Sequence, residues 1–160
     1  MIIVSDASPI RALHFLGLLP ILRELYGDVV VPTAVQEELL VPRIRLDSID
    51  LSPYDFIQIR SPRELSRVNA FLQMLHRGES EALALGLELQ ADLILIDELA
   101  GRSAALENGL RPLGTLGVLL EAKSNGLVQE VRPFLQRLRA ELNFFISNAL
   151  HQQIVELAGE

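Results

Sequence analysis

Short apolar runs alternate with amphipathic segments along the first two thirds of the chain. The runs typical of strands buried on both faces are residues 2–5 (IIVS), 29–31 (VVV) and 93–96 (LILI), with weaker runs at 56–59 (FIQI) and 111–114 (RPLG). Helical patterns lie between them, at residues 10–25, interrupted near Pro20, and at 32–40, 64–76, 79–90 and 98–108. This alternation predicts an α/β fold with a parallel sheet covered by helices on both faces.

Two regions depart from the alternation. Residues 42–63 are rich in turn residues and break the periodicity, which favours a flap. The chain from residue 115 onward predicts three helices, at 115–124, 130–141 and about 147–158. Because the sequence contains neither a repeat nor a linker, we expect one domain over residues 1–160, with a C-terminal helical extension around 130–160.

Composition and charge narrow the class of protein. With 160 residues, of which 49% are hydrophobic, the chain is long enough to bury a core, and it contains no cysteine. The lack of cysteine fits a reducing cytoplasm, and the apolar runs are too short to span a membrane. The formal charge of -7 speaks against a non-specific nucleic-acid coat, but a nuclease with an acidic metal site remains possible. We therefore expect a cytoplasmic protein.

Acidic residues follow two of the predicted strands. Asp6 comes directly after the first strand, and Asp97, with Glu98 beside it, comes after the LILI strand. Ligands of open parallel sheets bind outside the carboxyl ends of the strands. An Asp after a strand is also a common helix N-cap. If the two strands are neighbours, the carboxylates converge, and they repel each other unless a cation or a proton lies between them.

Further acids lie on the predicted helices. Glu38 is on or next to the apolar stripe of its helix, so that it either extends to water or points into the cleft beside Asp6. Glu79 and Glu81 occupy the first turn of a later helix, where acids complement the helix dipole. They lie on different faces, so at most one is expected to reach the site, and periodicity does not decide which.

Four gathered carboxylates restrict the chemistry. All-oxygen sites suit Mg²⁺ or Mn²⁺, and these ions activate water and stabilise the charge of a displacement at phosphorus. The sequence does not support a histidine metal site, since the three histidines have no metal-ligand spacing. It does not support a serine hydrolase site either, since no Gly-x-Ser-x-Gly motif is present. The acids therefore indicate metal-assisted hydrolysis of a phosphodiester.

Several segments together resemble the PIN-domain superfamily of ribonucleases. They are VSDASPI, VPTAVQEEL, GESEALALG, LILIDELAGRSAA, LRPLGTLGVLLEAKSNGLV and FFISNALHQQIVELAGE. Each is weak alone, but their order and spacing are specific. The superfamily includes toxin nucleases of toxin–antitoxin pairs, and this chain looks like the subclass described as predicted nucleic-acid-binding proteins containing a PIN domain.

The resemblance implies a three-layer α/β/α fold with an acidic Mg²⁺ or Mn²⁺ site. The family acids fall on Asp6, Glu38, Glu81 (alternative Glu79) and Asp97 (alternative Glu98), and Ser8 and Arg102 match supporting positions. Ser8 would orient a water molecule or cap the next helix, and Arg102 would contact RNA phosphate or pair with an acid. Many PIN toxins have Asp as the third acid and Thr-x-Asp at the fourth, where this chain has Glu and IDE.

We therefore predict a metal-dependent endoribonuclease that hydrolyses single-stranded RNA, acting as the toxin of a toxin–antitoxin pair. Unpaired RNA is the expected substrate because its backbone and bases can be splayed into a cleft. An antitoxin protein and a second copy in a homodimer are partners that the resemblance implies. The alternative is a PIN-like module that binds RNA or a protein partner without cutting.

Overall fold

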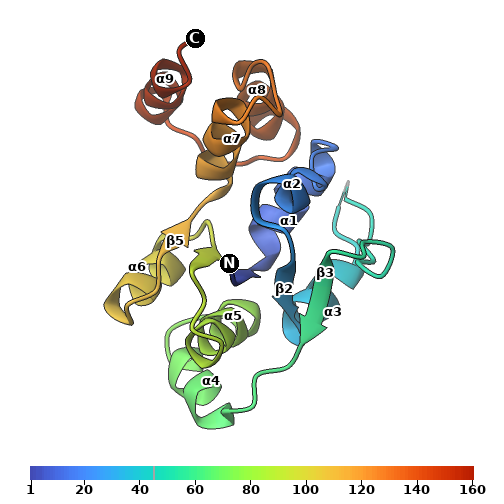
Figure 1. Ribbon diagram of the computed structural model, residues 1–160, viewed down its shortest axis with the longest axis vertical. Coiled ribbons are helices and arrows are strands. Elements are labelled where there is room, and N and C mark those ends of the chain that lie inside the picture. Colours follow the sequence, from blue (N-terminus) through green and yellow to red (C-terminus); the bar gives the residue numbers. More distant parts are fainter. Residues whose placement is uncertain (45) are drawn as a thin grey trace.

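A five-stranded parallel sheet forms the centre of the computed structural model, which describes residues 1–44 and 46–160 (Figure 1). The strands are β1 (Ile3–Ser5), β2 (Val29–Pro32), β3 (Ile57–Arg60), β4 (Leu93–Leu95) and β5 (Pro112–Leu113). Their order across the sheet is β3-β2-β1-β4-β5, and each neighbouring pair is parallel. Each strand coincides with, or lies within one residue of, an apolar run singled out in the sequence, so the predicted parallel sheet is confirmed.

Helices cover both faces of this sheet. They are α1 (Ala7–Phe15), α2 (Ile21–Tyr26), α3 (Thr33–Leu40), α4 (Leu65–Leu72), α5 (Arg77–Glu88), α6 (Leu99–Glu107), α7 (Thr115–Ser124), α8 (Arg132–Glu141) and α9 (Asn148–Leu157). Figure 1 shows α4 and α5 at one end of the molecule and α7, α8 and α9 at the other, with the strands between them. Within the described ranges, none of these helices has the length and apolar character needed to cross a membrane.

Two hydrophobic clusters, one on each face, make the fold a three-layer α/β/α arrangement. Ile3 of β1 joins the larger cluster, and the next residue, Val4, joins the smaller cluster under α5 and α6. In β4, Leu95 and Ile94 divide between the clusters in the same way. Successive side chains of a strand point to opposite faces, which explains why these runs are apolar at every position.

The predicted break in the first helical segment occurs before Pro20. Helix α1 ends at Phe15, and Gly17 follows with a φ of 72°, a left-handed conformation that glycine adopts without steric cost. Pro20 is then the residue immediately before α2. The segment therefore forms two helices, as the sequence predicts.

Much of the stretch over residues 42–63 is fixed to the core. Ile49 and Leu51 are buried, and the Ile49 N–H donates to the Leu39 carbonyl at 2.7 Å. The Gln36 amide also bonds to the backbone of both residues. The interpretation as a flap therefore does not hold for residues 49–60, and Arg45 of this stretch lies outside the described residues.

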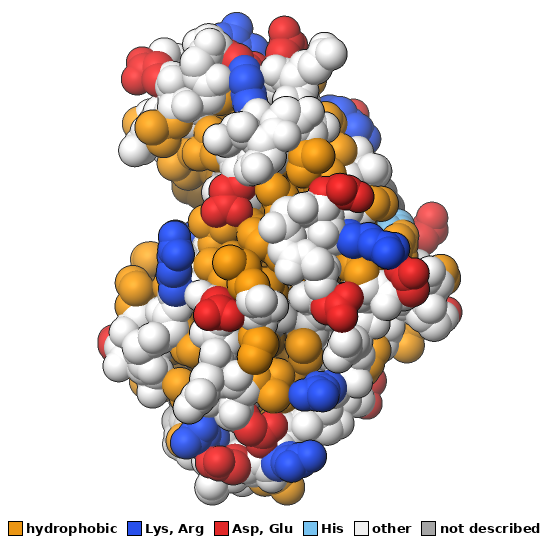
Figure 2. Space-filling view, viewed as in Figure 1, with side chains coloured by type: hydrophobic (Ala, Val, Ile, Leu, Met, Phe, Trp, Pro, Cys, Tyr) orange, Lys and Arg blue, Asp and Glu red, His pale blue; other side chains and the backbone are white. Residues whose placement is uncertain are grey.

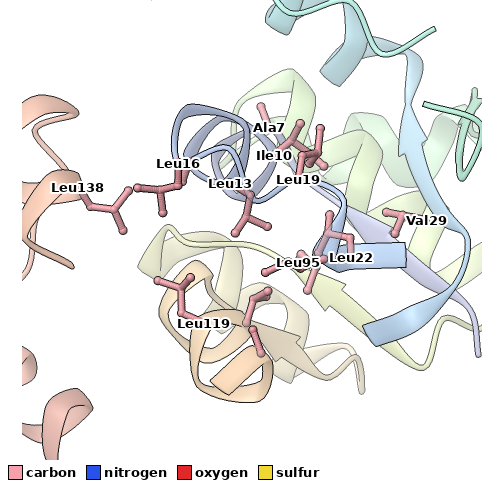
Figure 3. Packing of buried hydrophobic residues seen from close by; sticks show 14 of the residues in the cluster. Ala7, Ile10, Leu13, Leu16, Leu19, Leu22, Val29, Leu95, Leu119 and Leu138 are labelled. Atoms are coloured by element: carbon pink, nitrogen blue, oxygen red, sulfur yellow. The ribbon is translucent and has the colours of Figure 1, made fainter. Parts of the chain in front are cut away.

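The C-terminal helices contribute to the larger hydrophobic cluster. Leu135 and Leu138 of α8 and Val155 of α9 are buried in the cluster that contains Ile3 of β1. Figure 3 shows Leu138 pointing toward Leu16, which follows α1. The last helices therefore cover the end of the core formed by α1 and α7.

Candidate active site

A cleft of about 870 Å³ opens at the carboxyl ends of β1 and β4. These strands are neighbours, and the chain reverses its direction of travel across the sheet between them, which is where open parallel sheets bind ligands. Five carboxylates line the cleft, those of Asp6, Glu38, Glu79, Asp97 and Glu98. The structure thus brings together acids that are up to 92 positions apart in the sequence.

Asp6 and Glu79 are the most deeply buried of these acids. The backbone N–H of Asp6 continues the pairing of β1 with β4 by donating to the Leu95 carbonyl at 2.9 Å, and the residue is only 5% exposed. The pKa of Asp6 is raised to about 7, chiefly by burial and also by the charges of Glu79 and Glu38, against the lowering effect of the Ala7 N–H. The carboxyl group is therefore poised to exchange a proton for a cation near neutral pH.

Asp97 is held in place by three donors. The Ser8 hydroxyl donates to Oδ2 at 2.7 Å, the Thr115 hydroxyl donates to the same oxygen at 2.7 Å, and the Thr115 N–H donates to Oδ1 at 2.7 Å. Ser8 therefore orients an acid of the cleft, while the residue at the N-cap of α1, Asp6, makes no side-chain capping bond among the described residues. The start of α1, the end of β4 and the start of α7 are tied together at this carboxylate.

Glu79 reaches the cleft from the first turn of α5. Its Oε1 atom accepts from the His76 N–H at 3.4 Å, whereas Oε2 is buried with no hydrogen-bond partner among the described residues. Burial raises the pKa of Glu79, and the charge of Glu98 adds to this. Gly101 of α6 leaves room for it, because a Cβ atom there would lie 2.9 Å from Glu79 Oε2.

Glu81 lies apart from the cleft. Its Oε1 atom accepts from the Ala34 N–H at 3.2 Å, at the start of α3, and its Oε2 atom accepts from Arg77 Nε at 3.3 Å. Residues two positions apart on a helix point about 200° away from each other. The structure therefore directs Glu79, the alternative of the sequence prediction, into the cleft, and directs Glu81 toward the backbone of α3.

Glu38 enters the cleft from α3 and lies near two cations. Its Oε2 atom is 3.8 Å from Arg11 Nη1 and 3.7 Å from Arg43 Nη2. A Cβ atom on Gly78 would lie 3.3 Å from Glu38 Oε1 and 3.4 Å from Asp6 Oδ1, so this glycine lets both carboxylates approach the start of α5. Glu38 therefore belongs to the same site as Asp6.

Arg102 and Glu98 occupy the α6 side of the site. Glu98 is the residue before α6 and lines the cleft beside Asp97. Arg102 Nη1 and Asp97 Oδ1 both approach Gly114. A Cβ atom added to this glycine would lie 2.7 Å from the first atom and 3.0 Å from the second. Arg102 is thus near Asp97, but within the described ranges it forms no ion pair with it and does not line the cleft.

The cleft has a wall that the sequence did not predict. The residues after α8, Leu142 to Phe145, line it together with Arg11, Arg43 and His76. Arg11 lies within an apolar helical stripe of the sequence, so no pattern marked it as a site residue, and it is only 9% exposed. The FF pair at 144–145 begins the last segment of the family resemblance, but its proximity to the acids could not be predicted, because it depends on how α8 folds back over α1.

The donor set fits a hard divalent cation in its chemistry. All five acids offer oxygen, and the buried, unpartnered Oε2 atom of Glu79 is an orphan acceptor of the kind that a cation satisfies. Among residues 1–44 and 46–160, no group of three or more His, Asp or Glu side chains is arranged to hold an ion. Binding therefore requires these side chains to approach one another.

Comparison with known proteins identifies the family. Residues 2–160 match the model of the DUF3368 family, which is described as a PIN domain, a nuclease-type fold that typically uses divalent metals. The comparison with curated proteins found no match. Since the match covers nearly the whole chain and agrees with the parallel three-layer fold, the chain belongs to the DUF3368 family of PIN domains.

Proposed function

We propose that this protein is a metal-dependent endoribonuclease that hydrolyses phosphodiester bonds of single-stranded RNA. The observation that carries the proposal is the gathering of five carboxylates in one cleft, with the pKa of Asp6 at about 7. Buried acids that raise each other's pKa favour a binding partner that neutralises them. The family, in which nuclease activity is general, supplies the class of reaction.

Asp6, Glu38, Glu79 and Asp97 are the residues that we assign to Mg²⁺ or Mn²⁺, with Glu98 beside them. Such an ion, when bound, activates water and neutralises charge at the phosphodiester. This assignment replaces Glu81, the residue preferred from the sequence, with Glu79, because Glu81 is engaged with Ala34 and Arg77.

The chain's own residues have two further tasks in this proposal. Ser8 and Thr115 fix the orientation of Asp97 through their hydrogen bonds. Arg11 and Arg43 offer positive charge within the cleft, where a phosphate of the substrate would approach. Both arginines are near Glu38, so they also hold that side chain at the site.

The distribution of surface charge supports recognition inside the cleft. On the face in Figure 2, acidic and basic side chains are interspersed, with hydrophobic side chains across the middle. A protein with a formal charge of -7 gains little from non-specific phosphate attraction. Unpaired RNA fits this arrangement, since a single strand can bend into a cleft. A toxin role, an antitoxin partner and a homodimer belong to the proposal through the family resemblance.

The test is cleavage of a mixed-sequence fluorogenic RNA by purified protein with Mn²⁺, with Mg²⁺ and with chelator. Asp6→Asn and Glu79→Gln are expected to lose cleavage by at least about 100-fold, because each removes a charge that the cation requires. The matched control is Glu81→Gln on the same helix, which should cut nearly as well as the unaltered protein. Cleavage that survives Asp6→Asn, or that needs no metal, contradicts the proposal.

A binding module that does not cut is the second candidate. It is favoured by the lack, within the described part of the chain, of three acids already arranged around one ion. This candidate predicts RNA binding by well-folded protein without cleavage in either metal. It also predicts that Asp6→Asn leaves binding unchanged.

A further inference from the structure

An aromatic side chain projects from the wall of the acidic cleft. Phe145 lines the cleft although its residue is 87% exposed. It lies between α8 and α9, in the segment Leu142 to Phe145 that forms this wall. Leu99, which is 80% exposed, also lines the cleft, so the Phe145 ring belongs to an exposed apolar lining beside the carboxylates and arginines and not to the core.

The backbone on both sides of Phe145 is fixed. The Phe144 N–H donates to the Leu138 carbonyl at 2.9 Å, and the Phe144 side chain packs against the larger core cluster. On the other side, Arg139 Nε donates to the Ile146 carbonyl at 2.9 Å, and Ile146 is buried. The segment therefore presents the Phe145 ring from a supported backbone.

The cleft combines the groups that recognise one unpaired nucleotide. Carboxylates for a cation and the guanidinium groups of Arg11 and Arg43 address the phosphate, and the exposed ring of Phe145 offers a flat apolar face to the base. Aromatic side chains stack on bases of any sequence, because every base has a π-face. A base inside a double helix is already stacked on both sides and cannot use this surface.

We propose that Phe145 is a base-stacking residue that selects unpaired nucleotides next to the bond that is cut. The assignment of the substrate phosphate to the cleft rests on the proposed function. Stacking makes the site tolerant of base identity but selective for single strands. An exposed aromatic ring can also anchor a protein partner, but Phe145 shares the cleft with the acids and does not lie on an outer helix face, which favours the nucleotide.

The test compares two short single-stranded probes with the same number of phosphates, one of ordinary RNA and one abasic along its length. Binding is measured in Ca²⁺ by fluorescence anisotropy, with a gel to show that the probes stay intact. Phe145→Ala should bind the RNA about 5- to 100-fold more weakly and should bind the abasic probe as the unaltered protein does. Phe145→Trp should restore RNA binding. Leu106→Ala, which alters an exposed leucine on α6, should leave the binding of both probes unchanged.

The outcomes separate this proposal from the proposed function. If the unaltered protein cuts RNA with metal but Phe145→Ala binds both probes normally, stacking is overturned and the nuclease assignment stands. If base-dependent binding is lost in Phe145→Ala while no metal supports cleavage, stacking stands and the nuclease assignment fails. Three other outcomes overturn the stacking role. In the first, Phe145→Ala weakens the binding of both probes equally, and in the second, it loses self-association while its RNA binding is unchanged. The third outcome is that the unaltered protein binds neither probe.

Discussion

At the scale of single residues, Asp6 carries a conflict between folding and function. Folding places this carboxylate at 5% exposure beside other acids, and its pKa rises to about 7 as a result. A neutral side chain at the same place would fold more easily. The conflict is typical of a site that is organised around a ligand rather than around stability.

The first prediction is that Asp6→Asn stabilises the metal-free protein at alkaline pH. Between the ordinary pKa of 3.8 and the folded pKa of about 7, the unfolded chain loses its proton first, so the stability of the unaltered protein falls as the pH rises. At about pH 8, the variant should gain roughly 2–4 kcal/mol in the free energy of unfolding. At about pH 4, close to the ordinary pKa of 3.8, the folded state and a large part of the unfolded chains are protonated, so only a small part of this gain should remain.

Urea denaturation in chelator, at about pH 4 and about pH 8, measures this difference. Adding Mn²⁺ at the higher pH should raise the stability of the unaltered protein more than that of Asp6→Asn, since a ligand that binds only the folded state stabilises it. A variant that is equally stable or less stable at the higher pH would contradict the burial of a charged carboxylate.

Whether a residue of the cleft could be predicted from the sequence depended on whether a local pattern shows where its side chain points. Asp6 and Asp97 were identifiable because they directly follow strands whose carboxyl ends meet. The choice between Glu79 and Glu81 could not be made from the sequence, because α5 is buried over most of its surface and both of its faces are apolar. Phe145 lies in a segment of the family resemblance, but no pattern placed it beside the acids, since that position depends on contacts between distant helices.

At the scale of elements, small residues set how closely helices approach the site. A Cβ atom on Gly101 of α6 would lie 2.4 Å from Ile96 Cδ1 and 2.9 Å from Glu79 Oε2. The glycine thus permits α6 to pack directly on the end of β4 and over an acid of the cleft. The sequence located α6 well, but the closeness of its packing follows only from the assembled layers.

We therefore predict that Gly101→Ala lowers the free energy of unfolding by about 1–3 kcal/mol, because the added methyl group must displace Ile96 or the helix itself. Ser103→Ala, at an exposed position of the same helix, is the matched control and should leave stability nearly unchanged. Urea titration of both proteins gives the comparison. If Gly101→Ala has the same free energy of unfolding as the unaltered protein, α6 shifts to accommodate the methyl group and the prediction is wrong.

At the scale of the whole molecule, the C-terminal helices share a core with the first strand. Leu138 of α8 is fully buried and points toward Leu16 in Figure 3, so α8 and α1 stabilise each other across more than a hundred residues of sequence. The sequence predicted α8 and α9 as helices but left their place open. Their docking also positions the wall of the cleft that contains Phe145.

Leu138→Ala is expected to lower the free energy of unfolding by about 2–5 kcal/mol, through lost burial and a residual cavity. Leu157→Ala on α9, where the leucine is 66% exposed, should cost far less. If α8 belongs to the common core, Leu138→Ala should still unfold in one cooperative transition. A separate early transition would mean that the C-terminal helices melt on their own.

The strand order also governs when the acidic cleft can form during synthesis. β1 emerges from the ribosome first, but its partner β4 begins only at Leu93, and the acids of the cleft come from both sides of this pairing. The ribosome covers a further length of nascent chain, so Asp6 has no Asp97 beside it until residues well beyond β4 have been translated. Under the proposed function, a nascent chain therefore cannot cut RNA around the ribosome until the residues that follow β4 have left it.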